Sequence, residues 1–385
     1  MADLFLDVSA KAVLENLKRA CVAVALLGLF GAGCAAPSPT VGLRLNQIQV
    51  IGTHNSYHQR ASAPLLKLIG LYKPEAVREL DYEHRPLAEQ LSRLCIRQIE
   101  LDCYADPDGG RFAQPLGPRL AGAAGFGVAP TNSSVELLKP GIKVMHIPDV
   151  DYGTSVLTLV DGLRETLEWS QAHPRHVPVF ILIELKSETV GAGFTKALPW
   201  DESGFAELER EILSVFPRQF ILTPDDIRGG AATLREGLQA HGWPALDSAR
   251  GVMFGLDNGG GVRDAYLRGH PSLEGRLLFV SVSPANPAAA WMERNDPIAD
   301  FADIQRLVRE GFLVRTRADE PTEQARANDT RMRDRALASG AQFISTDFPE
   351  PDPKFSPYCV QLPGRRPARV NPVNGPANTA NANIE

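Results

Sequence analysis

The sequence predicts an α/β fold of the TIM-type (β/α)8 barrel class. Short runs rich in β-branched and aromatic residues alternate along the chain with longer amphipathic stretches. This alternation of strands and helices indicates a parallel sheet. We count eight strand-like runs, which is the number that closes such a barrel. Several of these runs are apolar first and polar at their carboxyl end, where a TIM-type barrel carries its chemistry.

The expected strands span residues 48–53, 96–103, 142–147, 179–186, 251–257, 277–283, 312–316 and 341–347. Amphipathic helical patterns lie between several of them, at residues 156–171, 204–216, 298–309 and 322–338. In the fourth strand, one face is wholly apolar and suits packing against helices. Its other face begins with Phe180 and Leu182 and ends with Glu184 and Lys186. That switch predicts a polar barrel mouth, because alternate residues of a strand share a face.

The chain ends are expected to lie outside the barrel domain, which we assign to residues 45–362. Residues 1–36 contain a basic pair and an uncharged run that are typical of a signal peptide. Cys34 lies in a context like a bacterial lipoprotein cleavage site, so secretion and lipid anchoring both remain open. Either would put the protein outside the cytoplasm without a stable membrane span. Residues 37–44 are interpreted as a linker, and residues 363–385 as a disordered tail rich in Pro and Asn.

Composition excludes several classes of function. The net charge is −6, which argues against nucleic-acid binding. No CxxC or HExxH motif is present, which argues against structural zinc and zinc proteases. Cys95 and Cys103, if on one strand, lie ~26 Å apart at ~3.3 Å per residue, so no disulfide framework is expected. The Gly/Ala/Pro-rich segment 104–140 is either an active-site loop or surface disorder. The protein is expected to be a monomer.

Six polar residues at strand ends form the candidate site: His54, Asn55, Glu100, Asp102, His146 and Glu184. Ca²⁺ takes oxygen ligands from carboxylates, amide carbonyls and water. Asn55, Glu100, Asp102 and Glu184 supply such oxygens, so they are the predicted calcium ligands. Histidines beside an oxygen-only metal site suggest acid–base work rather than ligation.

The implied reaction is cleavage of a phosphodiester by a hydroxyl of the substrate itself. Glu100 or Glu184 would take the proton of that hydroxyl with help from the metal, and Glu100 is our candidate catalytic carboxylate. His54 would donate to a non-bridging phosphate oxygen, and His146 would protonate the leaving alkoxide. Taken alone, each residue has a structural interpretation; Glu184, for example, could simply pair with Lys186. Together, they favour catalysis.

Four motifs carry a family resemblance: His54-Asn-Ser-Tyr, Glu100-Leu-Asp-Cys-Tyr, Met145-His146 and Ile183-Glu184-Leu. They resemble the catalytic core of calcium-dependent phosphoinositide-specific phospholipase C, within the PLC-like phosphodiesterase superfamily. The likeness is to the small bacterial secreted form, which consists of the catalytic barrel alone. The resemblance implies the same four calcium ligands, with His54 and His146 as the catalytic pair. It also implies a phospholipid substrate at a membrane surface. The chain departs from animal relatives in placing Ile147-Pro-Asp, rather than Gly, after the second histidine.

Three further cations are candidate phosphate or headgroup binders: Lys186, Arg315 and Arg317. His58 and His84 are interpreted as incidental. One rival function is that of a glycerophosphodiester phosphodiesterase on the same barrel, but its typical His-Arg-Gly and Glu-Asn-Thr triplets are absent. Another is a non-catalytic cell-surface lipoprotein, which would have no physical need for both histidines.

Overall fold

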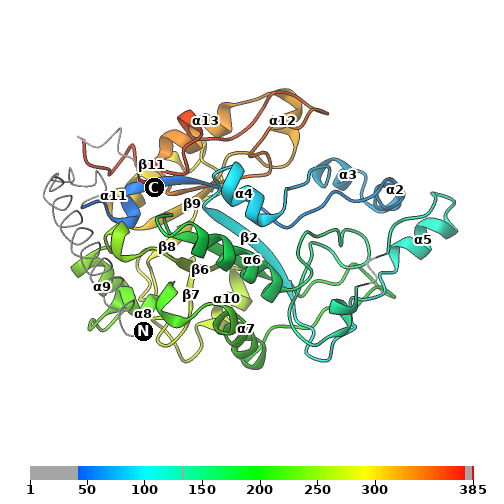
Figure 1. The fold of residues 1–385 in the computed structure, drawn as a ribbon, viewed down its shortest axis with the longest axis horizontal. Helices are drawn as coiled ribbons and strands as arrows, with labels where there is room; N and C mark the ends of the chain where they lie inside the picture. Colours follow the sequence, from blue (N-terminus) through cyan, green and yellow to red (C-terminus); the bar gives the residue numbers. More distant parts are fainter. Residues whose placement is uncertain (1–41, 132–133, 378–383) are drawn as a thin grey trace, which may run out of the picture. The chain divides into compact units, whose positions relative to one another are not determined.

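The computed structural model describes residues 42–131, 134–377 and 384–385 (Figure 1). The expected signal segment, with Cys34, and most of the expected linker lie outside these residues. All described residues belong to one compact unit. Among them, no helix is both long and apolar enough to span a bilayer. Among the described residues, Cys95, Cys103 and Cys359 are free thiols.

Eight parallel strands form a ring, which confirms the TIM-type barrel. In order around the ring they are β1 (Ile48–Thr53), β2 (Gln98–Tyr104), β4 (Val179–Leu185), β6 (Val252–Leu256), β7 (Leu278–Val280), β8 (Trp291–Glu293), β9 (Leu313–Arg317) and β10 (Phe343–Thr346). A parallel bridge between Ser281 and Trp291 joins β7 to β8 and closes the ring. Inside it, Phe180 packs on Trp291 and Phe343 from distant strands, so the barrel has a filled apolar floor.

One of the eight predicted strands was wrong, and one strand of the ring was missed. The run at 142–147 supplies only β3 (Lys143–Val144), which pairs antiparallel with the end of β2 instead of joining the ring. After β2 the chain forms the long connection 104–140. It then comes back to the carboxyl end of β2, where β3 pairs with β2 in the opposite direction. The place in the ring belongs to β8, a three-residue strand too short to stand out in the sequence. A further short strand, β5 (Ile221–Leu222), adds to β6.

The C-terminal segment also differs from the expected disordered tail. Residues 363–377 include η5 (Pro363–Arg365) and β11 (Arg369–Val370), and β11 pairs antiparallel with β1. The Arg369 guanidinium donates to Gln49 Oε1 (2.8 Å), and Asn371 Nδ2 donates to the Gly340 carbonyl (2.7 Å). Polar side chains thus fasten this segment to the barrel. Residues 378–383 lie outside the described part.

Helices surround the strands, as the amphipathic patterns predicted. They are α2 (Ala63–Tyr72), α3 (Ala76–Glu79), α4 (Leu87–Arg93), α5 (Gly117–Ala123), α6 (Leu159–Ala172), α7 (Glu202–Val215), α8 (Pro224–Arg228), α9 (Leu234–His241), α10 (Gly260–Tyr266), α11 (Phe301–Arg309), α12 (Glu323–Ala327) and α13 (Arg331–Ser339). Short 3-10 turns are η1 (Leu45–Gln47), η2 (Val135–Leu138), η3 (Arg218–Phe220) and η4 (Leu246–Ser248). The helices α6 and α7 begin where Thr158 and Asp201 accept backbone N–H bonds, as N-cap residues do.

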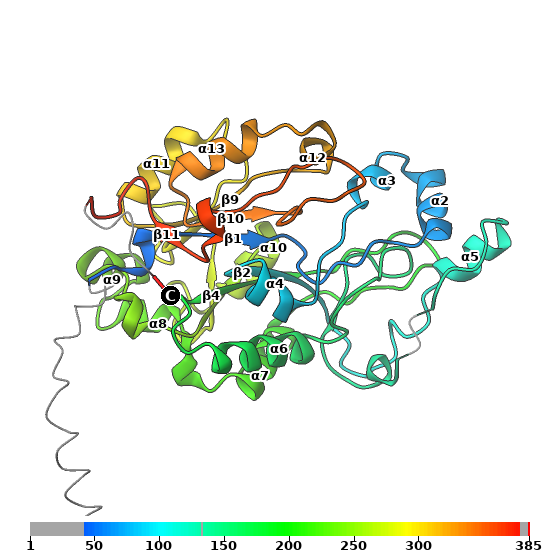
Figure 2. The same cartoon turned by 45° about the horizontal axis from the view of Figure 1, so that its top comes forward.

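The connections after β1, β2, β3 and β4 are long, and they gather beyond the carboxyl ends of those strands. The helices α2, α3 and α5 from these connections lie together to one side of the barrel (Figures 1 and 2). They enclose an apolar cluster of their own, separate from the barrel core, which includes Leu68, Ile69, Leu80 and Val150. These connections therefore build one wall of the barrel mouth.

Candidate active site

Three carboxylates meet at the mouth of the barrel. Glu100 and Asp102 lie two residues apart on β2 and project to the same side, and Glu184 pairs in register with Asp102 from the neighbouring β4. One oxygen from each of the three lies within 4.8 Å of the others. Glu100 and Asp102 are buried, whereas Glu184 is partly exposed. The structure therefore brings together the three acidic residues that the sequence proposed as ligands.

The donor atoms of this cluster fit a hard divalent cation. Glu100 Oε1 and both oxygens of Asp102 are buried and have no hydrogen-bond partner among the described residues. Burial, followed by the charge of Asp257, raises the pKa of Glu100 to about 8. Burial and the charge of Glu184 raise the pKa of Asp102 well above its usual range. Crowded, buried carboxylates whose oxygens accept no hydrogen bond are costly unless enough positive charge neutralises them, and a divalent cation supplies such charge.

Asn55 lies next to this cluster in a strained conformation. It follows β1 with φ 44°, a left-handed value that asparagine tolerates better than most residues. Its Nδ2 donates to the Tyr82 hydroxyl (3.0 Å). This bond fixes the orientation of the amide, so that Oδ1 points away from Tyr82. The Tyr57 hydroxyl donates to that Oδ1 at 3.4 Å. After burial, the charge of Asp102 is the largest cause of the raised pKa of Tyr57, so Tyr57 links the amide to the carboxylates.

Lys186 provides positive charge to the same cluster. Its Nζ lies 3.1 Å from Glu184 Oε1 and 3.5 Å from Asp102 Oδ2. Burial alone would lower the pKa of Lys186, but Asp102 and Glu184 outweigh it and raise that pKa. Lys186 is therefore a permanent cation at the edge of the carboxylate group.

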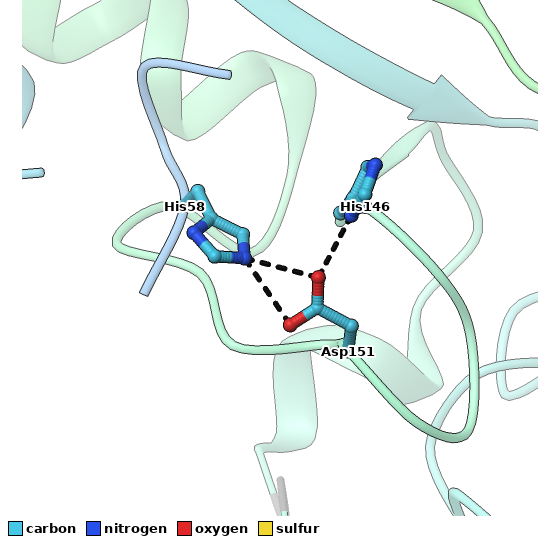
Figure 3. A group of neighbouring side chains, drawn as sticks. All are labelled: His58, His146 and Asp151. Carbon is cyan, nitrogen blue, oxygen red and sulfur yellow. Dashed lines mark hydrogen bonds and ion pairs between the residues drawn. The ribbon is translucent and has the colours of Figure 1, made fainter. Parts of the chain in front are cut away.

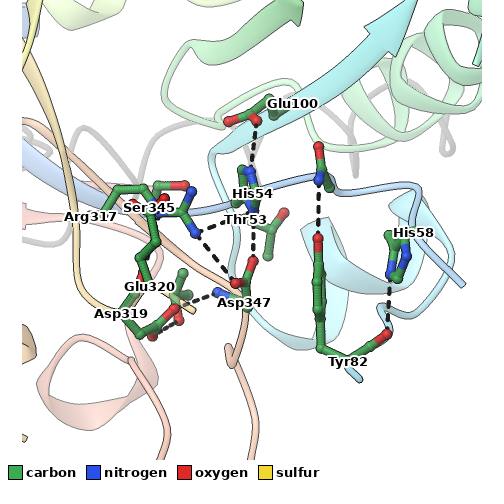
Figure 4. A network of polar contacts seen from close by, with 12 residues as sticks. Thr53, His54, His58, Tyr82, Glu100, Arg317, Asp319, Glu320, Ser345 and Asp347 are labelled. Carbon is green, nitrogen blue, oxygen red and sulfur yellow. Dashed lines mark hydrogen bonds and ion pairs between the residues drawn. The ribbon is translucent and has the colours of Figure 1, made fainter. Parts of the chain in front are cut away.

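His54 lies between two carboxylates, as Figure 4 shows. Its Nδ1 is 2.8 Å from Asp347 Oδ1, and its Nε2 is 3.5 Å from Glu100 Oε1. The Arg317 Nη2 lies 3.3 Å from both His54 Nδ1 and Asp347 Oδ2. Burial and then the charge of Arg317 lower the pKa of His54 to about 3. An anionic phosphate beside Nε2 would oppose both effects and favour the protonated form.

His146 shares one buried carboxylate with a second histidine (Figure 3). His146 Nδ1 donates to Asp151 Oδ2 at 2.7 Å, and His58 Nε2 lies 3.0 Å from the same oxygen. Burial would raise the pKa of Asp151, but His58 and His146 outweigh it and hold that pKa below its usual range. The bond to Nδ1 leaves Nε2 of His146 free to handle a proton. The side chain of His146 is 19% exposed, so substrate can reach it.

His58 joins this pair to the rest of the site. It is fully buried, and its Nδ1 donates to the Tyr82 carbonyl at 3.1 Å. Because both ring nitrogens face acceptors, the protonated form is favoured, and Asp151 raises the pKa of His58 despite its burial. The His58 ring also stacks on Tyr82, whose hydroxyl holds Asn55. His84 Nε2 donates to the His54 carbonyl at 2.8 Å. Both histidines interpreted as incidental thus contact the polar network of the site.

Arg315 and Arg317 lie inside the site but are engaged with protein carboxylates. Arg315 is 2% exposed, and its Nη2 donates to Glu100 Oε2 at 2.8 Å. Its Nη1 donates to Asn295 Oδ1 at 2.8 Å. Arg317 is 5% exposed and pairs with Asp347. In this arrangement Arg315 orients Glu100, and Arg317 orients His54. Lys186 is more exposed than either arginine, so of the three cations predicted to bind substrate it is the most accessible.

The sequence reasoning missed Asp151, Asp347 and Tyr82. Asp347 could have been found, because it ends the last expected strand in the same way that Asp102 ends the second. Asp151 and Tyr82 come from irregular connections, and no strand-end pattern marks them.

Comparison with known proteins identifies the family. The sequence matches the model for phosphoinositide phospholipase C, Ca²⁺-dependent, over residues 43–372. The chain belongs to this family. The protein is accordingly a phosphoric diester hydrolase of the phosphoinositide phospholipase C type, with Ca²⁺ as its cofactor. A search of the curated proteins found no match.

Solved structures of a Pseudomonas enzyme share the fold of this chain. The calcium-dependent phosphoinositol-specific phospholipase C from Pseudomonas sp, in an apo crystal form, aligns with a TM-score of 0.51 at 14% identity, covering 86% of this chain and 96% of that one. Its myoinositol complex aligns at 0.50 and 14%, covering 85% and 95%. A phosphatidylinositol-specific enzyme from Streptomyces antibioticus aligns at 0.45 and 17%, covering 80% and 96%. The Pseudomonas likeness supports the barrel fold of this chain.

Proposed function

We propose that the protein cleaves the phosphodiester of phosphatidylinositol-type lipids to diacylglycerol and inositol (cyclic) phosphate. The observation that carries this proposal is the way in which His54, which lies beside the carboxylate cluster, and His146, which lines the same pocket as Lys186, are held. Each histidine has its Nδ1 on a buried carboxylate, Asp347 for His54 and Asp151 for His146. His146 therefore has Nε2 available for the reacting phosphate, and His54 presents Nε2 on the side of Glu100 Oε1 (3.5 Å), where the phosphate would lie.

The proposed calcium ligands are Asn55, Glu100, Asp102 and Glu184. Bound there, Ca²⁺ would lower the pKa of a substrate hydroxyl and neutralise charge on phosphorus. The unpaired buried oxygens of Glu100 and Asp102 support this ligand set. So does the absence of thiols from the cluster, since hard cations prefer oxygen.

Proton transfers are assigned to three side chains. Glu100 accepts the proton of the inositol hydroxyl next to the phosphate; Arg315 holds its Oε2, so Oε1 is the available atom. Glu184 is the alternative base. His54 donates to a non-bridging phosphate oxygen, and Lys186 adds positive charge to the same phosphate. His146 gives its proton to the glycerol oxygen as that bond breaks. The inositol oxygen thus replaces the glycerol oxygen on phosphorus.

Glycerophosphoinositol separates this proposal from the glycerophosphodiester phosphodiesterase alternative. The proposed reaction breaks the bond between phosphorus and the glycerol oxygen, and so releases glycerol and inositol cyclic phosphate. The alternative would release glycerol 3-phosphate and inositol. Phosphorus NMR of the product mixture identifies the bond that was cut. Glycerol 3-phosphate as the first product would overturn the proposal, and a protein without turnover on any phosphodiester would favour the binding lipoprotein.

We also propose that the enzyme works outside the cytoplasm on a lipid surface. The sequence of residues 1–36 supports export, and the described residues contain no spanning helix.

A further inference from the structure

An apolar pocket of about 640 Å³ opens directly beside His146. Its walls come from α2, α3 and the connections after β3 and β4, and they include Leu68, Ile69, Leu80, Ile147, Val150 and Phe194. Its polar lining consists of His146, Tyr104 and Lys186 at the catalytic mouth, together with Lys73, Glu188 and Thr189. The pocket therefore continues from the active site and is not a separate surface feature. Its volume is within the range of about 300–1,000 Å³ that holds small organic ligands.

The walls of this pocket are held in place. Leu68, Ile69, Leu80 and Val150 pack in a buried cluster of their own. Asp149, beside Val150, ties two of the connections together. Its Oδ1 accepts from the Leu116 backbone N–H (2.7 Å), and its Oδ2 accepts from that of Thr195 (2.6 Å), the neighbour of Phe194. Packing and hydrogen bonds thus hold the walls of the pocket in place.

The chemistry of the proposed reaction decides what such a pocket can receive. If His146 protonates the leaving oxygen, that oxygen must lie against its Nε2. The glycerol carbon and its acyl chains are covalently attached to the same oxygen, so they extend from His146. An inositol ring would leave its hydroxyls unpaired against these apolar walls, at a cost that hydrocarbon avoids. Tyr72 and Val190, 77% and 47% exposed, border the pocket where a chain would enter from a lipid surface.

We propose that this pocket binds an acyl chain of the leaving diacylglycerol, so that the enzyme selects chain-bearing substrates even without a membrane. The proposal rests on the proposed function, because it uses the role of His146. It goes beyond that function by naming the part of the lipid that the α2–α3 wall recognises. The chain would be recognised as a single molecule, which distinguishes pocket binding from mere contact with a bilayer.

The test compares two soluble substrates that differ only in their acyl chains: glycerophosphoinositol and dihexanoylphosphatidylinositol below its micelle concentration. Each buried methylene favours binding about fourfold. Burial of three methylenes should therefore raise kcat/KM about 60-fold for the dihexanoyl substrate. Phe194→Asp places a charge in the wall and should bring this ratio toward one. Phe220→Asp is its matched control, on an exposed phenylalanine at the opposite end of the strands, and should keep the ratio.

A second pair of variants, both at exposed positions, keeps the test decisive if Phe194→Asp fails to fold. Val190→Asp changes an exposed rim position and should lower the ratio, whereas Val135→Asp, also exposed, should not. Equal kcat/KM for the two substrates, or a preference that appears only with micelles, would overturn the pocket assignment and leave the proposed function standing. Binding of both compounds is also measured in chelator by calorimetry. Tighter binding of the dihexanoyl compound without any turnover in Ca²⁺ would support the pocket and overturn the proposed function.

Discussion

Asp151→Asn should disable the general acid without touching the metal ligands. The Asp151 carboxylate is fully buried and accepts from two histidines, at 2.7 Å from His146 Nδ1 and 3.0 Å from His58 Nε2. An amide of the same shape has one acceptor oxygen and one NH2 group. One of the two histidines must therefore face a donor and lose its partner. His146 would lose the contact that orients its ring and fixes its tautomer.

The expected magnitudes follow from these contacts. A hydrogen bond to a charged group contributes about 1.5–3 kcal/mol, and we expect the free energy of unfolding to fall by about that amount. A positioned general acid contributes about 10²–10⁴-fold to rate, so kcat on phosphatidylinositol should fall within that range. The loss should shrink strongly on an inositol phosphodiester with an acidic phenol leaving group, because a phenolate departs without a proton. A structural defect alone would slow both substrates equally.

The assay is kcat for wild type, Asp151→Asn, His146→Ala and the double variant on both substrates, alongside thermal unfolding. Asp106→Asn is the matched control, because Asp106 is equally buried but pairs with Lys143 instead of a histidine. If Asp151 acts through His146, the double variant should be no slower than His146→Ala. Additive losses, or equal losses on the two substrates, would refute the positioning role.

The other predictions concern the metal, the second histidine and the N-terminus. Asp102→Asn should weaken Ca²⁺ affinity while preserving the fold, because the substitution removes an anionic ligand at the barrel mouth but leaves core packing unchanged. Calcium calorimetry and thermal unfolding check this prediction. An unfolded variant would show that Asp102 is structural. His54→Ala should slow the natural and the phenol substrate alike, since His54 acts on the phosphoryl oxygens; rescue by the phenol leaving group would reverse the roles of the two histidines. Labelled fatty acid should attach to the wild type and not to Cys34→Ser if the protein is a lipoprotein, whereas a mature N-terminus near Pro37 without label would indicate simple secretion.

Part of this site could be predicted because strands carry their pattern in the sequence. Glu100 and Asp102 alternate with apolar residues on β2, and Glu184 follows Phe180 and Leu182 on one face of β4. Period-two alternation fixes the side to which such residues point. Parallel strands then bring their ends to one edge, so the carboxylate cluster follows from the barrel itself.

The partners of the histidines could not be predicted in this way. Asp151 lies in a loop, and its place beside His58 depends on contacts across 93 residues of chain. Arg315 was proposed to bind substrate because its sequence context does not show that Glu100 already pairs with it. The strand β8 was missed because three residues show too little alternation, and β3 was misplaced because a short run does not indicate its direction. These features depend on tertiary packing, which local patterns do not encode.

The most direct test of the account is the initial rate of inositol phosphate release from phosphatidylinositol vesicles, measured in Ca²⁺ and in chelator. The buried oxygens of Glu100 and Asp102 that accept no hydrogen bond favour a hard cation between them. Chelation should therefore abolish turnover, and Ca²⁺ should restore it better than Zn²⁺. An undiminished rate in chelator would contradict the account, because these carboxylates would then have to work without the metal they are arranged to hold.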